Sequence, residues 1–211
     1  MTVGATAPQG AACDDGVWSP LILDPAAPGC DVRLHELVAE GRVWHVHDTL
    51  ELQLRDLVRA RGCGGRLSEA DVDERVASVV DGVGLDAYGR WIHYPWSGRL
   101  VRVLPELEFR ELRLDRNRDK ITASEQRRLR EATVAIVGLS VGNAAAITLT
   151  MEGAYGHLKL ADFDRLELSN MNRLRAGIHD LGVPKAVLAA RQIVELDPYA
   201  SLTLFTGAHG T

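Results

Sequence analysis

A glycine-containing turn and a later acidic residue are the parts of this 211-residue chain whose types and spacing suit chemistry. The turn, Gly138 to Asn143, follows a β-branched run that we expect to form a buried strand. Such a turn lets backbone N–H groups at a helix N-terminus reach phosphate oxygens. Asp162 stands 24 residues after Gly138, where a carboxylate can accept both hydroxyls of a ribose. Together they predict a nucleotide site and leave open whether the ligand is NAD or ATP.

The turn matches the dinucleotide-binding pattern only in part. Gly138 holds the place of the first glycine, Ser140 stands where the second is usual, and Asn143 stands where the third is usual. Asn tolerates positive φ better than most residues, but any side chain narrows the approach of a phosphate. A plain strand-to-helix turn is therefore the alternative interpretation.

The elements around these residues alternate between strand and helix. We expect strands at Thr133–Val137, His157–Ala161 and Ser201–Phe205, and helices at Ser124–Arg130, Ala144–Met151 and Lys185–Leu196. This order is the N-terminal half of a doubly wound, Rossmann-like parallel sheet in an α/β fold. We place this domain at residues 111–211 and expect it to be incomplete.

An open sheet edge follows from that interpretation. The strand at Thr133–Val137 is normally central, and its second neighbour would lie beyond Thr211. An uncovered apolar edge is a template for association. We therefore expect a homodimer or larger assembly, or cover from the extended segment near Leu100 to Leu114.

The N-terminal half predicts a small α/β domain of unknown role at residues 16–110, after a flexible tail at 1–15. The patterns indicate a strand at Arg42–His47, helices from Leu50 to Gly62 and at Glu69–Val80, and an extended region from Trp91 to Leu114 that begins with a hairpin. We expect the four tryptophans, Trp18 among them, to fill the core of this domain.

Four ordered motifs in the second half resemble the ThiF/MoeB/HesA family and its ubiquitin-activating relatives. They are Arg113 to Asn117 with Gln126, the glycine turn, Ala161 to Arg173, and Gly182 to Ala186. The leader, the hairpin and the turn in this order also look like actinobacterial chains of the MoeY type. The resemblance covers the chain from about Arg113 onward.

The resemblance implies an enzyme that uses ATP and magnesium to adenylate the C-terminal carboxylate of a ubiquitin-like or sulfur-carrier protein. It implies catalytic roles for Arg116, Arg173 and Lys185, with Arg116 reaching into the site of a second copy in a homodimer. It assigns the nucleotide to Gly138, Ser140, Gly142, Asn143, Asp162, Asp164 and Asn172, with Asp162 on the ribose and Asn172 on the triphosphate. The magnesium-binding aspartate is expected beyond Thr211, so we expect this chain alone to be inactive.

Departures from the family pattern keep two other functions open. Ser140, Val141 and Asn143 replace loop glycines, and Asn117 replaces a glutamine, which favours a degenerate, non-catalytic module for docking or dimerisation. A NAD-linked oxidoreductase is the third hypothesis. Asn172, Arg173 and Lys185 disfavour it, because they suit a triphosphate better than a dinucleotide.

Composition excludes several classes of protein. The net charge of −5 argues against nucleic acid as a partner, and no apolar run approaches the roughly 20 residues that cross a bilayer. We expect a cytoplasmic protein, because Cys13, Cys30 and Cys63 have no spacing typical of a disulfide framework or a zinc site. His45 and His47 could share a strand face, but no third ligand is evident nearby, so we assign no metal-binding residue.

Overall fold

The computed structural model describes residues 16–62 and 67–207, which form two compact units. The N-terminal unit contains residues 20–115, and the C-terminal unit contains residues 116–207 together with residues 16–19. The predicted tail at 1–15, with Cys13, and also Cys63 lie outside the described residues. None of the helices within the described ranges is long and apolar enough to cross a membrane.

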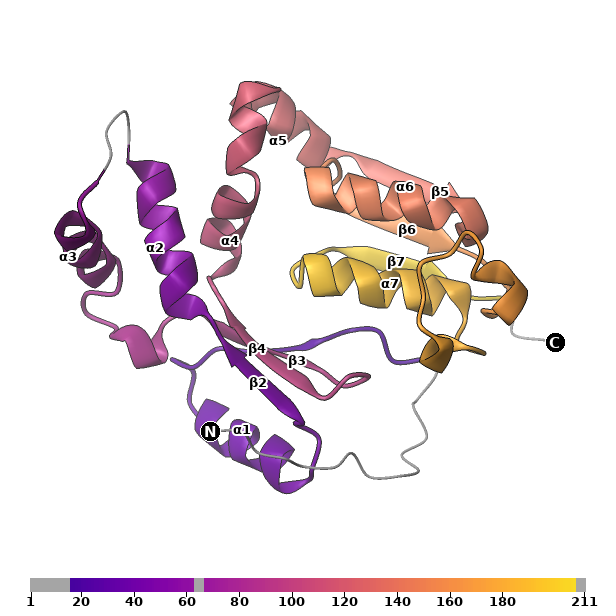
Figure 1. Cartoon of the computed structure of the whole chain (residues 1–211), viewed down its shortest axis with the longest axis horizontal. Coiled ribbons are helices and arrows are strands. Elements are labelled where there is room, and N and C mark those ends of the chain that lie inside the picture. The colour runs from indigo at the N-terminus through magenta and orange to yellow at the C-terminus, as the bar shows by residue number, and fades with distance from the viewer. Residues whose placement is uncertain (1–15, 63–66, 208–211) are drawn as a thin grey trace. The chain divides into compact units, whose positions relative to one another are not determined.

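The N-terminal unit is built on a four-stranded mixed sheet (Figure 1). Its elements are β1 (Leu21–Leu23), α1 (Cys30–Ala39), β2 (His45–Asp48), α2 (Leu50–Arg61), α3 (Glu69–Val79), the 3-10 turn η1 (Leu85–Ala87), β3 (Arg90–Tyr94), β4 (Arg99–Val103) and α4 (Glu106–Arg113). The strand order is β1-β3-β4-β2, with β2 parallel to β4 and the other pairs antiparallel. The predicted hairpin is confirmed, and Ile92 pairs with Val101.

Helix α2 carries the core of this unit. Leu50, Leu54 and Leu57 lie on one helical face and are fully buried together with Leu104. The capping box at the start of α3 is confirmed, because the Ser68 hydroxyl accepts from the Asp71 N–H. The short strand β1 and helix α1 were not predicted from the sequence.

The extended pattern expected to continue to Leu114 is wrong after Pro105. Residues 106–113 form helix α4, which starts directly after Pro105 and has an ion pair of 2.7 Å between Glu106 and Arg110. Phe109 and Leu112 pack against the α2 core. Their spacing of three residues suits a helix face, and burial of that face overrides the strand-like pattern.

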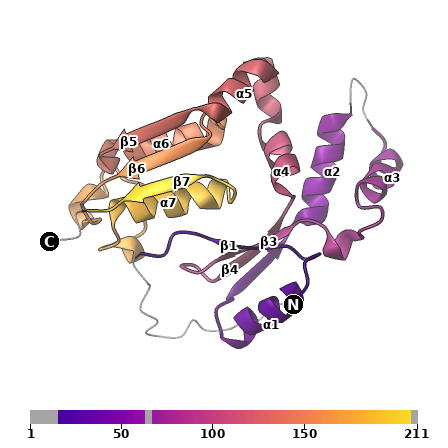
Figure 2. The same ribbon diagram turned by 180° about the vertical axis from the view of Figure 1, so that it is seen from behind.

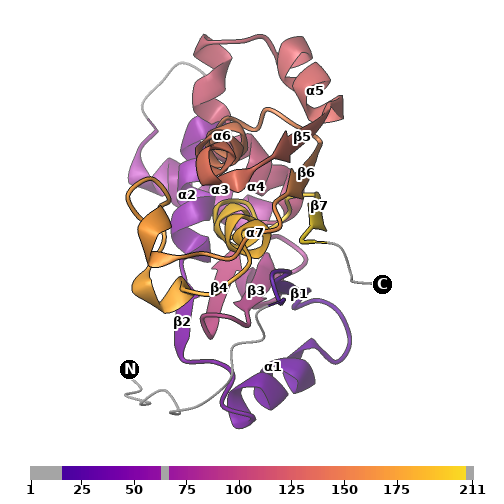
Figure 3. The same cartoon turned by 90° about the vertical axis from the view of Figure 1, so that its right-hand side faces the viewer.

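The C-terminal unit is built on a three-stranded parallel sheet in the order β5-β6-β7. Its elements are η2 (Asp115–Asp119), α5 (Ala123–Glu131), β5 (Thr133–Val137), α6 (Leu139–Glu152), β6 (His157–Ala161), η3 (Leu168–Asn170), η4 (Ile178–Asp180), α7 (Lys185–Leu196) and β7 (Leu202–Phe205). Helices α6 and α7 cover the same face of the sheet (Figures 1 and 3), and the other face is turned to the viewer in Figure 2. The predicted half of a doubly wound fold is confirmed.

Two details of this unit differ from the sequence-based expectation. Helix α6 begins at Leu139 rather than Ala144, because Gly138 has φ of 83° and turns the chain straight from β5 into the helix. Trp18 packs against the core of the C-terminal unit rather than that of the N-terminal unit. Arg191 of α7 donates to the Val17 carbonyl at 2.8 Å and holds this segment in place.

Strand β5 lies at one edge of the sheet within the described residues. The expected cover by an extended segment near Leu100 to Leu114 is wrong, because β4 pairs with β2 and β3 and residues 106–113 are helical. The expectation that strand β5 is buried is wrong, because only Val134 and Ile136 pack against the core and the other residues are exposed. Val137 at the end of β5 is 80% exposed. We expected the β5 edge to be covered either by that extended segment or by another molecule. Association with another molecule stays a prediction.

Candidate functional site

The carboxyl ends of β5 and β6 meet the N-termini of α6 and α7. Parallel strands put their carboxyl ends at the same sheet edge, and in open α/β sheets this is where ligands bind. The turn at Gly138, the acidic residues after β6 and Lys185 at the start of α7 therefore come together. This set of groups is called the carboxyl-end network below.

Asp162 is the centre of this network. It is 8% exposed, and its Oδ2 accepts a hydrogen bond of 2.6 Å from the Leu139 N–H, the first amide of α6. Its Oδ1 accepts a bond of 2.9 Å from the Asp164 N–H. A carboxylate at this place neutralises the positive end of the α6 dipole and satisfies an N–H that has no partner inside the helix. Asp162 thus connects β6 to the glycine turn.

Lys185 connects the same region to α7. The residue is 4% exposed, and its ammonium lies 2.8 Å from Asp164 Oδ2 and 3.3 Å from Ser140 Oγ. A buried ammonium needs a partner, and the Asp164 carboxylate provides one while its own side chain stays largely exposed. The network therefore holds a cation in a fixed place beside the N-terminus of α6.

The second glycine of the turn has a packing role. A Cβ added to Gly142 would lie 2.5 Å from Ile136 Cγ2, so only glycine allows α6 to approach β5 this closely. At Gly138, by contrast, no atom lies within 4 Å of an added Cβ, and the positive φ is the reason for glycine. The two glycines thus serve the geometry of the turn in different ways.

Asn143 does not join the carboxyl-end network by any described bond. Its side chain is buried against α7, where its Nδ2 donates to Gln192 Oε1 at 2.9 Å. The Oδ1 of Asn143 is buried and has no hydrogen-bond partner among the described residues. The residue in the third glycine position therefore lies at the contact between α6 and α7.

The remaining candidate residues are on the surface. Arg173 and Asn172 are exposed and bonded to each other at 2.9 Å. Arg116 is exposed on η2, and no described hydrogen bond or ion pair joins its side chain to another described residue. The structure thus groups Gly138, Ser140, Asp162, Asp164 and Lys185, and it leaves these three outside that network.

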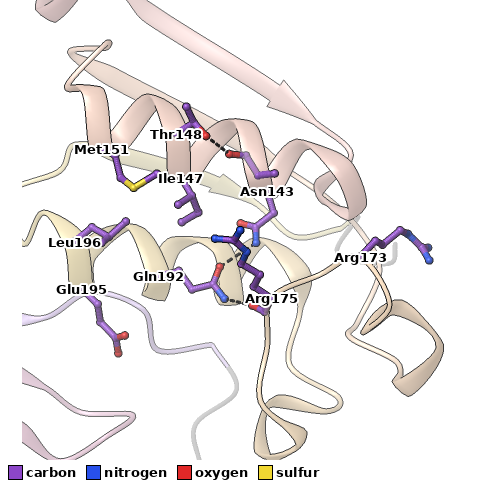
Figure 4. Close-up of a pocket in the computed structure, with 10 residues that line it drawn as sticks. Asn143, Ile147, Thr148, Met151, Arg173, Arg175, Gln192, Glu195 and Leu196 are labelled. Carbon is purple, nitrogen blue, oxygen red and sulfur yellow. Dashed lines mark hydrogen bonds between the residues drawn. The ribbon is translucent and has the colours of Figure 1, made fainter.

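A cavity of about 680 Å³ lies between α6 and α7 (Figure 4). Asn143, Gln192 and Arg175 surround one part of it, while Met151 and Leu196 lie at the other end. Sequence reasoning missed Arg175 and Gln192 because neither belongs to a motif. Their proximity to Asn143 arises only when α7 packs against α6.

Magnesium was also expected from the family resemblance. Within residues 16–62 and 67–207, no three His, Cys, Asp or Glu side chains are grouped as a metal ion requires. Asp164, the exposed carboxylate of the network, is already paired with Lys185. These residues therefore do not form a resident magnesium site, and we derive no step through the metal.

Comparisons with known proteins find similarity in the second half of the chain. Residues 114–211 match the model of the ThiF family. The chain is 53% identical over 122 residues to Uncharacterized protein MT1398 of Mycobacterium tuberculosis, over 58% of this chain and 17% of that protein. It is 44% identical over 80 residues to Ubiquitin-like modifier-activating enzyme 5 of Arabidopsis thaliana, over 37% of this chain and 18% of that protein. The matches thus span less than a fifth of the length of these two relatives.

Solved structures show a weaker likeness. The crystal structure of E. coli tRNA N6-threonylcarbamoyladenosine dehydratase, TcdA, in complex with ATP is 25% identical, covering 46% of this chain and 40% of that chain with a TM-score of 0.44. The crystal structure of E. coli MccB with ATP is 16% identical, covering 76% and 48% with a TM-score of 0.43. The likeness to the ThiF family therefore rests on the sequence match over residues 114–211 and not on these structures.

Proposed function

We propose that the C-terminal unit binds ATP at the carboxyl-end network and takes part in adenylating the terminal carboxylate of a ubiquitin-like or sulfur-carrier protein. The observation that carries the proposal is the buried Lys185 ammonium, held by Asp164 and Ser140 beside the N-terminus of α6 in a ThiF family domain. The similarity to a ubiquitin-like modifier-activating enzyme supports the class of substrate.

The proposed reaction joins a carboxylate to AMP. A carboxylate oxygen attacks the α-phosphorus of ATP, the new P–O bond forms an acyl adenylate, and the bond to the β-phosphate breaks so that pyrophosphate leaves with the electron pair. Negative charge grows on the phosphate oxygens during this step, so fixed cations lower its barrier. Lys185 and Arg173 supply this charge from the same unit, and Arg116 supplies it from a second copy of the chain.

Asp162 has capacity left for a ribose. Each oxygen of an ionised carboxylate accepts two hydrogen bonds, and each Asp162 oxygen has one described donor, Leu139 or Asp164. The two backbone donors fix the carboxylate in place before a ligand arrives. The ribose hydroxyls would therefore meet an acceptor that needs no reorganisation.

Calorimetric titration of the whole chain with ATP and, separately, with NAD tests the proposal. We expect ATP to bind and NAD to bind at least about tenfold more weakly, because the network offers a cation to a triphosphate. Lys185→Met and Arg173→Gln should each weaken ATP binding about tenfold. Arg127→Gln, an exposed arginine on α5, is the matched control and should leave it unchanged. If ATP fails to bind at millimolar concentration, or if NAD binds as tightly as ATP, the proposal is wrong.

A second candidate is a non-catalytic ThiF module for docking or dimerisation. It is favoured by the bond between Asp162 and the Leu139 N–H, because the chain's own carboxylate occupies an amide that a phosphate loop offers to its ligand. This function predicts a stably folded chain that binds neither nucleotide. The same titration therefore separates the two candidates.

A further inference from the structure

The cavity between α6 and α7 combines a polar part with an apolar part. Asn143, Gln192 and Arg175 come together in one region, and Met151 and Leu196 lie at the other end (Figure 4). Its volume of about 680 Å³ is within the range of small-molecule sites. None of its described bonds involves Asp162, Asp164 or Lys185, so its chemistry can be considered apart from the carboxyl-end network.

A chain of hydrogen bonds fixes the orientation of the two amides in the polar part. The Gln192 Nε2 donates to the Arg175 carbonyl at 2.5 Å, so Gln192 Oε1 must be the atom that faces Asn143. That oxygen accepts from Asn143 Nδ2 at 2.9 Å, which leaves Asn143 Oδ1 as the remaining acceptor. Asn143 is 5% exposed, and this oxygen has no described partner. A buried carbonyl without a donor is costly, and a ligand N–H would remove that cost.

A cation lies in the same region. The side chain of Arg175 extends toward Asn143, whereas the guanidinium of Arg173 points away from both (Figure 4). The bond from Gln192 ends on the Arg175 backbone carbonyl and leaves the guanidinium unused. Within the described residues, no hydrogen bond or ion pair engages that guanidinium. Arg175 is exposed, and Glu195 of α7 is a carboxylate that also lines the cavity. The polar part thus offers a guanidinium without a described partner and an unused acceptor, and it favours a ligand that carries an anion and an N–H close together.

The other part of the cavity would hold an apolar group. Ile147 and Met151 of α6 and Leu196 of α7 line it, and Met151 is 50% exposed. Covering this surface with an aliphatic side chain removes apolar area from water. The apolar end of the cavity therefore favours a ligand whose anionic group is attached to an aliphatic side chain.

We propose that this cavity binds an α-amino carboxylate with an aliphatic side chain. Its carboxylate pairs with the Arg175 guanidinium, its N–H donates to Asn143 Oδ1, and its side chain packs on Ile147 and Met151. Carboxylate and N–H on the same carbon are shared by a free amino acid and by the C-terminal residue of a peptide. The site goes beyond the proposed function, because it requires no nucleotide.

Titration of the whole chain without ATP tests this site. The probes are leucine and N-acetyl-leucine, with N-acetyl-leucinamide, which lacks the carboxylate, and 4-methylpentanoate, which lacks the N–H, as matched analogues. Calorimetry gives the affinity, and the side-chain amide NMR signals of Asn143 and Gln192 report the location. We expect leucine or N-acetyl-leucine to bind and to shift both signals, and each analogue to bind about tenfold more weakly.

Variants locate the binding energy. Arg175→Gln keeps the backbone carbonyl that accepts from Gln192, and it should lower the affinity for the probe about tenfold. Arg127→Gln on α5 should leave this affinity unchanged. Tighter binding of N-acetyl-leucine would identify a peptide C-terminus as the source, and tighter binding of leucine would identify the free amino acid.

Three binding results would each overturn the proposal. The first is that neither leucine nor N-acetyl-leucine binds at 10 mM, on the order of the weakest affinity expected for so small a ligand. The second is that Arg175→Gln binds the probe as tightly as the unmodified chain does. The third is that either analogue binds as tightly as the probe that it matches. Sedimentation of the unmodified chain and of Met151→Lys is a separate test of the cavity. If the chain is an oligomer and Met151→Lys dissociates it, the cavity is an interface between copies and the proposal is wrong.

Discussion

The Asp162 carboxylate, at the end of β6, accepts a hydrogen bond of 2.6 Å from the Leu139 N–H at the start of α6. This bond joins two elements separated by the whole length of α6 and places a negative charge at the positive end of that helix. One residue thereby serves the fold and, in the proposed function, the ribose. Stability and ligand binding must therefore be measured together in any variant of Asp162.

Asp162→Ala should lower the free energy of unfolding by about 1–3 kcal/mol, because the N–H groups of Leu139 and Asp164 lose their acceptor in a buried place. Urea unfolding followed by circular dichroism measures the change. Asp119→Ala removes an exposed carboxylate from the same unit and should cost less than about 0.5 kcal/mol. Equal stability of the two variants would show that the Leu139 bond contributes nothing.

The two partners of the Lys185 and Asp164 ion pair should behave differently when each is removed. Asp164→Asn leaves the buried ammonium without an anion and should destabilise the chain by about 1–2 kcal/mol. Lys185→Met replaces the cation with an apolar group of similar length, so its stability should change by less than about 1 kcal/mol while ATP binding falls. Urea unfolding and calorimetry measure these effects. A larger loss of stability in Lys185→Met than in Asp164→Asn would contradict this account.

Gly142→Ala should destabilise the C-terminal unit by about 1–3 kcal/mol, because the new Cβ would overlap Ile136 Cγ2. A double-mutant cycle with Ile136→Ala tests the cause. The cost of Gly142→Ala should be smaller when Ile136 is already alanine, because the overlapping methyl group is absent. Additive costs in urea unfolding would assign the effect to another contact.

Burial lowers the pKa of His93 from its usual value of 6.5, and its Nε2–H donates to the Arg42 carbonyl at 3.1 Å. Below pH 6.5 the unfolded chain therefore binds more protons than the folded chain, so the free energy of unfolding falls as the pH is lowered toward the pKa of the folded state. His93→Gln should lose this dependence. Urea unfolding at several pH values between about 5 and 8 measures it.

The control for His93 is His47→Gln, which removes an exposed histidine on β2. Carboxyl groups titrate in all three proteins and cancel when their profiles are compared. The profile of His47→Gln should follow that of the unmodified chain. Parallel profiles for His93→Gln and the unmodified chain would exclude His93 as the source.

The edge at β5 should promote association. We expect the unmodified chain to sediment as a dimer or larger species, and Val137→Lys to shift it toward monomer, because a charge on an edge strand opposes pairing with another chain. Val141→Lys, at an equally exposed position on α6, is the control and should leave the species unchanged. Sedimentation velocity would contradict the prediction if the unmodified chain were monomeric.

The sequence by itself determined the type and order of the elements around the glycine turn. The strand at Thr133–Val137, the strand at His157–Ala161 and the helix at Lys185–Leu196 were all predicted with their observed bounds. Local patterns suffice there, because a β-branched apolar run favours a strand and a covering helix needs a 3.6-residue period. The topology of parallel strands then brings Gly138, Asp162 and Lys185 to the same end of the sheet.

Tertiary structure alone decided which atoms these residues contact. The sequence did not show that Asp162 caps α6, that Asn143 is buried against Gln192, or that Trp18 belongs to the C-terminal unit. Each of these contacts joins residues far apart along the chain, and no local pattern specifies which atoms meet. The helix after Pro105 was missed for the same reason, because burial of Phe109 and Leu112 against α2 outweighs the local preference for an extended chain.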